Sequence, residues 1–432
     1  MAEPQKGVYS MEKGFETLQV RAGYEFSELS GAVATPIAQT TAYVFPDYEY
    51  AKDLFALKQE GHIYTRITNP TVEMLENRMA ALEGAKASLA VSSGHSAIFL
   101  TMLALASCGD EIVSSRNIYG GAINLFTVTM KRMGITVHLV DGDNIEEFSQ
   151  YTNEKTKAYF IESIGNPNAN VADIKGLSKI AKKNGVPLVV DATFVTPYLQ
   201  KPLELGADIV VHSATKFLSG TGTSMCGIIC DGGTFDYTNG RFPDFTEPDE
   251  SYHGIRYAYD AAAAPLAVKA RVTLLRDLGC CLSPFNAFLV MQGIETLSLR
   301  MEKICKSALT VAGFLEDHEM VSRVNYPGLK SNKYYELSKE ILPLGSGGIF
   351  TFEIKGDREA GKRFIEKLKI FLHVANVGDA RSLVVHPATT THSQLSDEAL
   401  LKSGITANTV RLSIGLENTE DLILDLAQAL CN

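Results

Sequence analysis

Short apolar runs alternate with amphipathic stretches of helical period between Tyr64 and Asp260. The runs that predict strands are SLAV, DEIVSS, ITVHLV, KAYFIES, VPLVVDATF and ADIVVHSATK. They are rich in Val and Ile on both faces, and the stretches between them end at glycines such as Gly134 and Gly185. This pattern predicts an α/β fold, with a mostly parallel sheet covered by helices on both faces. Ligands bind beyond the carboxyl ends of such strands, so the polar residues that follow each run are candidates for a site.

The pattern changes after Gly254. Helical periodicity dominates from Ala261 to about Glu319. The later runs VSRVNYPG, GGIFTFEI, KIFLHVANV and TVRLSIG predict strands with helices between them. These features predict a second, smaller α+β domain at the C-terminal end.

The N-terminal segment has no regular period and carries an aromatic cluster, with members at Tyr43, Phe45, Tyr48 and Tyr50. We expect it to be an irregular arm that packs on another surface, such as that of a neighbouring subunit. The sequence therefore predicts three parts. They are an arm over residues 1–62, an α/β domain over 63–270 and an α+β domain over 271–432.

Composition narrows the class of protein. The 432 residues carry a formal net charge of −10, which argues against a protein that binds the phosphate backbone of nucleic acids. The seven cysteines form no C-x-x-C pair, which favours a reducing compartment, and no metal site is expected. No apolar stretch approaches the ~20 residues that span a bilayer, and the N-terminus lacks the apolar core of a signal peptide. We expect a cytoplasmic protein without a membrane partner.

Polar residues follow three of the predicted strands. The turn SSGHS, from Ser92 to Ser96, lies between a strand and a helix, where backbone N–H groups favour an anion. Asp191 ends one apolar run, and Lys216 follows the run IVVHSAT. Taken alone, these residues have simpler interpretations as an ordinary turn, a cap and a solvated lysine.

Taken together, the three features point to one cofactor. A phosphorylated pyridine aldehyde needs an amine for a Schiff base, an acid to hold its ring nitrogen protonated, and donors for its phosphate. Lys216, Asp191 and the SSGHS turn supply these groups. Further candidates are Ser213 and Thr215 for the phosphate, Tyr119 for stacking on the ring, and Arg411 for the α-carboxylate of an amino acid.

At this point the sequence resembles a known family, the pyridoxal-phosphate enzymes of cysteine and methionine metabolism, which include the cystathionine lyases and synthases. The resemblance extends from Gly23 to Gly415. The motifs YTRITNPT, SSGHSA, IYGG, SIGNPN, VVDATF, HSATKFLSG and RLSIG occur in the family's order. It implies a fold type I transferase with pyridoxal 5′-phosphate as cofactor.

The resemblance also implies a role for each matching residue. Lys216 becomes the Schiff-base lysine, Asp191 the partner of the pyridine nitrogen, and Tyr119 the stacking ring and a catalytic acid or base. The implied phosphate ligands are Gly94, the backbone of His95, Ser213 and Thr215, with Tyr64 and Arg66 from a neighbouring subunit. Asn166 is expected near the phenolic oxygen of the cofactor, and Arg411 is expected to bind the substrate carboxylate with help from Asn376. The shared site implies at least a dimer, and the family is typically tetrameric.

The chain departs from the family's usual pattern at four positions. His95 stands where most relatives have methionine, and Asn376 where many lyases have serine. Ala375 stands where cystathionine-cleaving relatives carry an acidic residue. Its absence argues against an enzyme that binds the distal amino group of cystathionine. Gly121 replaces the cysteine of typical methionine γ-lyases.

Three segments resemble those of O-acetylhomoserine sulfhydrylases: Phe235 to Tyr259, Leu278 to Leu289 and Ala375 to His392. The first of them is, from its residues alone, a Pro-rich acidic surface loop. The resemblance implies γ-replacement on O-acetyl-L-homoserine by sulfide or a thiol, which gives L-homocysteine or methionine, and acetate. Two alternatives stay open: a methionine or cystathionine γ-lyase that releases ammonia and a 2-oxo acid, and a non-catalytic scaffold. The acyl group and the sulfur donor also stay open.

Overall fold

The larger sheet has seven strands. The computed structural model describes residues 13–431 except 25–30, 57, 357 and 391–404. The strands are β1 (Ala87–Val91), β2 (Glu111–Ser115), β3 (Thr136–Val140), β4 (Thr156–Glu162), β5 (Leu188–Asp191), β6 (Ile209–Ser213) and β7 (Gly227–Asp231). Their order is β1-β7-β6-β5-β4-β2-β3. Only β7 runs antiparallel to its neighbours, so the prediction of a mostly parallel sheet is confirmed.

The antiparallel strand β7 was missing from the predicted strands. The connection from β6 to β7 contains no helix, and a parallel neighbour requires a crossover of a dozen or more residues that usually forms one. The chain therefore returns directly and pairs in the opposite direction. This places Lys216 in the connection, at the carboxyl end of β6.

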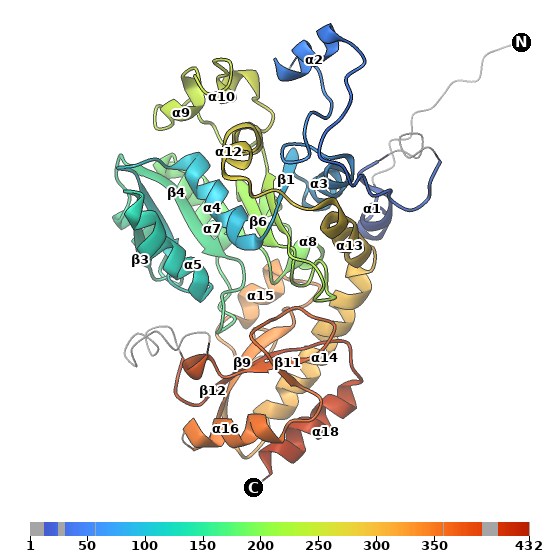
Figure 1. Ribbon diagram of the computed structural model, residues 1–432. Helices are drawn as coiled ribbons and strands as arrows, with labels where there is room; N and C mark the ends of the chain where they lie inside the picture. The colour runs from blue at the N-terminus through green and yellow to red at the C-terminus, as the bar shows by residue number, and fades with distance from the viewer. Residues whose placement is uncertain (1–12, 25–30, 57, 357, 391–404, 432) are drawn as a thin grey trace, which may run out of the picture.

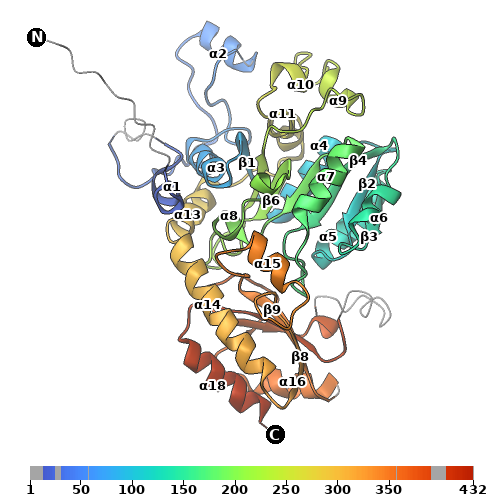
Figure 2. The same cartoon turned by 180° about the vertical axis from the view of Figure 1, so that it is seen from behind.

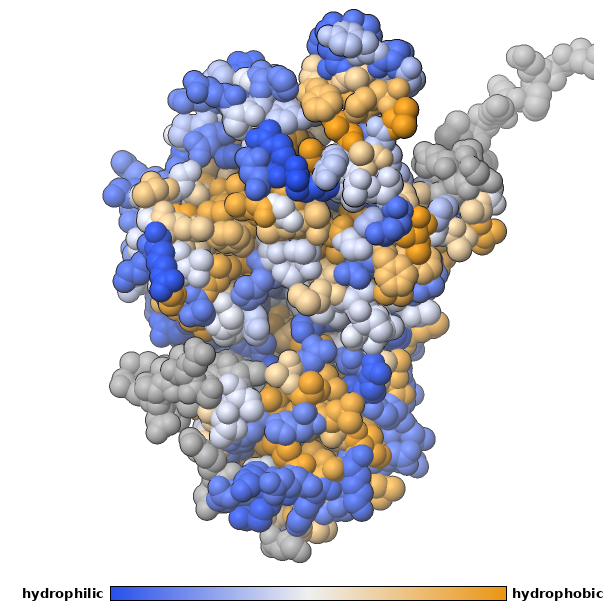
Figure 3. Space-filling model, in the orientation of Figure 1, coloured by the Kyte–Doolittle hydropathy of each residue, from blue (hydrophilic) through white to orange (hydrophobic). Residues whose placement is uncertain are grey.

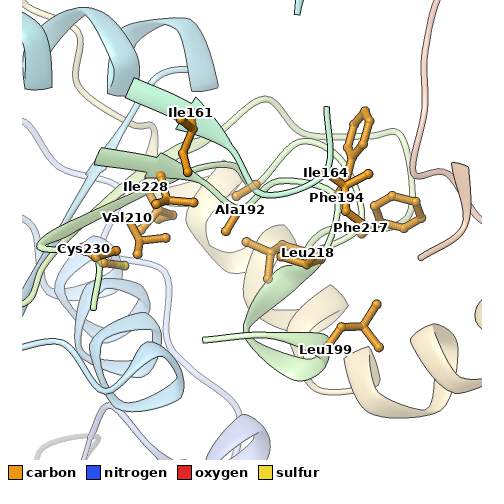
Figure 4. Packing of buried hydrophobic residues seen from close by; sticks show 14 of the residues in the cluster. Ile161, Ile164, Ala192, Phe194, Leu199, Val210, Phe217, Leu218, Ile228 and Cys230 are labelled. Carbon is orange, nitrogen blue, oxygen red and sulfur yellow. The ribbon is translucent and has the colours of Figure 1, made fainter. Parts of the chain in front are cut away.

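Helices cover both faces of this sheet (Figure 1). Alternate strand residues supply two apolar clusters: Val190 and Val210 point to one face, and Val189 and Val211 to the other. Figure 4 shows part of the first cluster, where Val210 lies beside residues of β4 and β7. On that face lie α3 (Pro70–Glu83), α7 (Ile174–Asn184) and α13 (Pro284–Ile294), and on the other α4 (Gly94–Leu105), η1 (Leu125–Met130) and η3 (Ala270–Leu275).

Local chemistry sets where these helices begin and end. The side chain of Asn69 accepts from the backbone N–H of Thr71 at the start of α3, which has Pro70 in its first turn. Asp173 caps α7 in the same way, and the helix ends at Gly185, whose φ of 64° favours glycine. The expected end of this helix at Gly185 agrees with the structure.

A second sheet of five strands lies in the C-terminal part of the chain (Figure 2). Its strands are β8 (Val321–Asn325), β9 (Ile349–Ile354), β10 (Leu372–His373), β11 (Leu383–Val385) and β12 (Thr409–Ser413), in the order β10-β11-β12-β9-β8. The helices beside it are α14 (Leu297–Glu316), α16 (Arg358–Lys367) and α18 (Thr419–Leu430). The first half of α14 packs in the core of the larger sheet through Met301, and its second half packs in the core of the smaller one through Val311. This helix therefore joins the two cores.

The N-terminal segment is more regular than expected. It contains α1 (Phe15–Arg21), which contacts α3 and α14, and α2 (Tyr48–Phe55), which projects from the rest of the molecule (Figures 1 and 2). The expectation of a wholly irregular arm was wrong at α2, because Asp47 caps this helix by accepting from the N–H of Tyr50 at 2.8 Å. Residues 1–12 and 25–30 of the predicted arm lie outside the described residues.

The segment from Phe235 to Tyr259 is not only a surface loop. Phe242, Phe245 and Tyr257 are buried and extend the second apolar cluster, and the rings of Tyr237 and Phe245 stack 4.0 Å apart. Most acidic residues of the segment, such as Glu250, are exposed, and Asp249 is partly buried. The remaining described helices are α5 (Gly120–Asn124), α6 (Ile145–Gln150), α8 (Thr196–Leu199), η2 (Pro202–Leu205), α9 (Pro243–Thr246), α10 (Tyr257–Asp260), α11 (Pro265–Lys269), α12 (Arg276–Leu278), α15 (Tyr335–Ile341) and η4 (Pro387–Thr389). Among the helices described, none has the length and apolar character needed to cross a membrane.

Two helical glycines offer a matched test of packing around the connection that carries Lys216. A Cβ atom at Gly293 in α13 would overlap the carbonyl oxygen of Ser219, whereas a Cβ at Gly313 in α14 meets no heavy atom within 4 Å. Gly293→Ala should lower stability by about 1–3 kcal/mol through overpacking. Gly313→Ala should raise it by about 0.5–1 kcal/mol, because alanine favours helix. Thermal unfolding of the two variants checks this, and an unchanged or higher midpoint for Gly293→Ala would contradict the close approach.

Candidate active site

A cavity of about 730 Å³ opens at the carboxyl ends of the parallel strands. Its walls come from the turns after β1, β2, β4, β5 and β6, from residues 375–377, and from β12 of the smaller sheet. The sequence-predicted residues that line it are Gly94, His95, Tyr119, Asn166, Asp191, Ser213, Thr215, Lys216, Asn376 and Arg411. Residues up to 317 positions apart in the chain, Gly94 and Arg411, thus meet in one cavity.

The N-terminus of α4 forms one end of the cavity. Ser93 caps this helix by accepting from the N–H of Ser96 at 3.1 Å, and Gly94 begins it. A Cβ at Gly94 would lie 2.5 Å from the Cβ of Ser213, so only glycine lets the helix start this close to β6. The first-turn N–H groups of a helix have no partners within the helix, and its dipole favours an anion there. This end of the cavity fits a phosphate.

Ser213 and Thr215 stand beside this helix start, as predicted. The Thr215 hydroxyl is partly engaged already, since it accepts from the N–H of Cys226 at 3.0 Å and donates to the carbonyl of the same residue at 3.3 Å. Ser213 is the better placed of the two hydroxyls to donate to a phosphate.

Asp191 ends β5 at the floor of the cavity. One of its oxygens accepts from the backbone N–H of Thr193 at 2.9 Å and from the Thr193 hydroxyl at 2.5 Å. Burial raises the pKa of Asp191, and these hydrogen bonds oppose the rise. A cation placed against the carboxylate would offset its loss of hydration, which is what a protonated pyridine nitrogen provides. The residue therefore fits the predicted role.

Lys216 projects into the same cavity, where its Nζ donates to Oδ1 of Asn376 at 2.6 Å. Burial, and then the charge of Arg411, lower the pKa of Lys216. Both effects favour the neutral amine, which is the form that attacks an aldehyde. No carboxylate is needed to hold the amine in place, because the amide of Asn376 does so.

The connection that follows Lys216 is held by a residue that the sequence did not reveal. Arg300 in α14 donates to the carbonyl of Phe217 at 2.7 Å, to that of Leu218 at 3.0 Å and to that of Gly293 at 2.7 Å. Its position in a predicted helix gave no sign of this role. The guanidinium thus gives partners to two carbonyls of the helix-free turn, those of Phe217 and Leu218, and links the turn to the carbonyl of Gly293 at the end of α13.

Arg411 reaches the cavity from β12 and is only 4% exposed. Its Nη1 donates to Oδ1 of Asn166 at 2.8 Å, and its Nη2 lies 3.4 Å from the carbonyl of Asn376. Burial lowers the pKa of Arg411 to about 10, so the guanidinium keeps its charge at neutral pH. Both partners are neutral amides, and among the described residues no carboxylate forms an ion pair with it. A buried cation without a counter-charge is costly, so the site fits an anionic substrate group.

Tyr119 precedes α5 and is 45% exposed, within the cavity. Its ring meets that of His95 edge to face, with 5.7 Å between the centroids. A Cβ at Gly121 would lie 2.5 Å from the Tyr119 ring and 2.9 Å from that of His95. The histidine at 95 and the glycine at 121, two of the departures from the family pattern, therefore occupy one space together.

Glu162 is the cavity residue that the sequence analysis missed most clearly. It ends β4 directly opposite Asp191 at the end of β5, and only 8% of it is exposed. The signal was present, because Glu162 is the acidic residue near the end of the apolar run KAYFIES, as Asp191 is of its own run. Its neighbour motif SIGNPN drew attention to Asn166 instead.

Tyr64 and Arg66 are not brought to the cavity of their own chain. They lie at the base of the arm, both exposed, with the Arg66 guanidinium 5.2 Å from the centre of the Tyr64 ring. Their predicted role needs a second subunit and stays a prediction. The described part of the chain contains no group of three or more His, Cys, Asp or Glu residues that could hold a metal ion.

Comparison with known proteins identifies the family. Residues 16–431 match the family of Cys/Met metabolism PLP-dependent enzymes, and the chain belongs to it. The fold described above is that of a pyridoxal-phosphate-dependent enzyme of fold type I, as predicted.

Two curated relatives are similar over almost their whole length. The O-acetyl-L-homoserine sulfhydrylase of Leptospira meyeri is 48% identical, over 98% of this chain and 98% of that protein. O-acetyl-L-homoserine sulfhydrylase 1 of Thermus thermophilus is 48% identical, over 96% of this chain and 99% of that protein. Among solved structures, a candidate O-acetylhomoserine (thiol)-lyase of Campylobacter jejuni is 41% identical with a TM-score of 0.94. The match covers 97% of this chain and 100% of that one, and that structure contains N′-pyridoxyl-lysine-5′-monophosphate.

The charge of Arg411 should control the titration of Lys216 in the cofactor-free enzyme. Because burial and Arg411 both disfavour the ammonium form, Lys216 should become reactive at lower pH than a lysine side chain in a short unstructured peptide. Arg411→Met should move the reactivity of Lys216 to higher pH, part of the way back, since burial remains. Acetylation rates against pH, followed by peptide mass spectrometry, measure this in both enzymes. An Arg411→Met profile that coincides with wild type would contradict the coupling.

Proposed function

We propose that the chain catalyses γ-replacement on O-acetyl-L-homoserine by sulfide, giving L-homocysteine and acetate. The relatives at 45–48% identity support this, since they are named O-acetylhomoserine sulfhydrylases or homocysteine synthase. The observation in this chain that carries the proposal is the buried guanidinium of Arg411, which forms no ion pair with any described residue and shares one cavity with Lys216 and Asp191. Such a cation suits the α-carboxylate of an amino acid whose amino group lies near Lys216.

Several residues of the cavity have a definite task in this reaction. Pyridoxal 5′-phosphate, when bound, supplies a ring that stabilises negative charge developing at the α-carbon of an amino acid. The N-terminus of α4 with Ser213 would hold its phosphate, and Asp191 would keep a proton on its ring nitrogen. Arg411 binds the α-carboxylate and so turns the α C–H toward Lys216.

Proton transfer falls to Lys216 and Tyr119. With its lowered pKa, the Lys216 amine would accept the α proton, hand it on within the cavity, and only then, as a free amine again, accept a β proton. The electron pair left at the β-carbon expels acetate from the γ-carbon. Sulfide then adds at the γ-carbon, and the protons return in reverse order. Tyr119 would pack against the cofactor ring and could serve as a second acid or base, since its side chain lines the cavity. Asn376, which accepts from Lys216, holds the amine between these proton transfers.

The same first steps would serve a γ-lyase, so the substrate range decides between the two. Ala375 lines the cavity at the position where cystathionine-cleaving relatives carry an acid, and it offers no partner for a distal amino group. This favours a small acyl-homoserine over cystathionine.

We further propose that the enzyme is a homo-oligomer, at least a dimer, with Tyr64 and Arg66 completing the phosphate site of a neighbouring subunit. Apolar side chains gather on the arm below its hydrophilic tip (Figure 3). Val44 is 97% exposed, Tyr48 79% and Phe55 51%, which is unusual for large apolar residues that face water. A second copy of the chain would cover them. A tetramer and a cytoplasmic location remain predictions of the sequence.

The reaction itself is tested by supplying O-acetyl-L-homoserine with sulfide and measuring homocysteine and acetate. We expect the two products in equal amounts, with little ammonia or 2-oxo acid. Lys216→Ala should lower the rate by at least about 10³-fold, because no other amine in the cavity can move the α proton. Release of ammonia and 2-oxobutanoate as the main products, from this substrate or from methionine, would instead identify a γ-lyase. Parallel reactions with O-succinyl-L-homoserine and with methanethiol identify the acyl group and the sulfur donor.

Subunit sharing is tested by mixing two inactive variants. Lys216→Ala and Arg66→Ala disable different chains of one shared site, so a hybrid dimer contains one intact site and one doubly altered site. Coexpression of the two in equal amounts should restore about a quarter of wild-type activity, although each variant alone is nearly inactive. The control mixes Lys216→Ala with Arg411→Ala. Lys216 and Arg411 line the cavity of the same chain, so each site of this hybrid carries one altered residue and no activity should return. Activity would return only if Arg411 also acted in the site of the neighbouring subunit. Failure of the Arg66 mixture to regain activity, with hybrids confirmed by mass spectrometry, would show that Arg66 acts within its own chain or not at all.

A further inference from the structure

The buried carboxyl group of Glu162 makes two hydrogen bonds that none of the roles above explains. One oxygen accepts from the backbone N–H of Tyr119 at 2.7 Å, and the other accepts from the backbone N–H of Asn166 at 3.0 Å. The two donors belong to different connections, one after β2 and one after β4. A single side chain therefore ties together two separate walls of the cavity.

Each of the two backbone groups carries a side chain with a task in the site. Tyr119 presents the stacking ring, and the α5 helix that follows it begins at the next residue. Asn166 presents its Oδ1 to Nη1 of Arg411 at 2.8 Å, which fixes the guanidinium that binds the substrate carboxylate. A shift of Glu162 would thus move the ring and the guanidinium at the same time.

We propose that Glu162 is a positioning residue, which anchors Tyr119 and Asn166 through their backbone amides and so sets the distance between the stacking ring and the carboxylate-binding Arg411. The proposal rests on the proposed function for its kinetic consequences, but its structural consequences do not depend on the substrate. Two acceptors facing two donors require both carboxyl oxygens. A glutamine of the same shape offers one acceptor, and its NH₂ group would face an N–H donor.

Burying the carboxyl group of Glu162 beside that of Asp191 costs free energy. Burial raises the pKa of Glu162, and the adjacent Asp191 raises it further, while the two N–H groups oppose the rise. A residue with no task at this place would be replaced by an apolar side chain at lower cost. The two hydrogen bonds account for the carboxyl group where packing alone does not.

The test uses the holoenzyme with Glu162→Gln, and Glu111→Gln as the matched control. Glu111 lies at the opposite, amino edge of the same sheet, where it accepts from Asn153 at 2.8 Å and contacts His138 at 2.8 Å, far from any residue of the cavity. We expect Glu162→Gln to alter the visible circular dichroism of the bound cofactor, because that signal depends on the ring stacked against it. We expect kcat/KM for the amino acid to fall about 10-fold to 100-fold, as displacement of positioning groups does. Glu111→Gln should leave both unchanged.

A second variant separates the position of the carboxyl group from its presence. Glu162→Asp keeps a carboxyl group beside Asp191, but it is one methylene shorter and should not reach both N–H groups. If Glu162 acts by position, this variant should change the circular dichroism and kcat/KM as Glu162→Gln does. A Glu162→Asp enzyme that behaves as wild type would overturn the proposal, because a carboxyl group at this place would then be sufficient without the two hydrogen bonds.

Hydrogen exchange of the wild-type holoenzyme provides a measurement that needs no variant to fold. The amides of Tyr119 and Asn166 should exchange slowly, at rates typical of hydrogen-bonded groups, although both lie in connections between strands. Exchange of either at the rate of an open loop would overturn the proposal. The exchange rates and the circular dichroism are both measured without substrate. If the enzyme does not convert O-acetyl-L-homoserine and sulfide, the proposed function fails, but these two measurements still test the positioning role.

Discussion

The hydrogen bond from Arg411 to Asn166 joins the two sheets of this enzyme at the cavity. Arg411 lies in the middle strand of the smaller sheet, and Asn166 follows β4 of the larger one, 245 residues earlier in the chain. Neither sheet alone forms the cavity, because one contributes the turns after its strands and the other contributes the guanidinium of Arg411. The long helix α14 fixes the distance between them, since it is packed into both cores. The geometry of the site therefore depends on how rigidly these two bodies are joined.

Much of the site could be predicted because parallel sheets place their ligands at one edge. Asp191 and Lys216 were recognisable as polar residues after apolar runs, and the order of the strands then brings them together. The partners of these residues could not be predicted in the same way. Three such contacts join segments more than 40 residues apart in the chain. Asn376 accepts from Lys216, Arg300 donates to the carbonyl of Phe217, and Glu162 accepts from the N–H of Tyr119. Periodicity contains no information about such contacts.

The elements that prediction missed have a common physical cause. Strand β7 is antiparallel and its connection from β6 contains no crossover helix, and the N-terminus of helix α2 is capped by one aspartate. The buried aromatic residues of the segment after Phe235 were interpreted as a loop, because prolines and acidic residues dominate its composition. In each case a local tertiary or capping interaction outweighed the average pattern. Prediction and structure agree best for strands that are buried on both faces, such as β4 to β6, because only apolar residues fit there.

The balance of charge in the cavity supports the proposal that the site is shared between subunits. Among the described residues that line it, Lys216 and Arg411 are the only lysine and arginine, and both are held near Asn376. A phosphate bound at the start of α4, as proposed, would carry between one and two negative charges, whereas the helix dipole supplies only about half a positive charge there. A further cation would then be needed. Arg66 is exposed at the base of the arm, close in sequence to the exposed apolar residues that a second copy of the chain would cover, so one contact between subunits would both bury those residues and bring a cation to the phosphate.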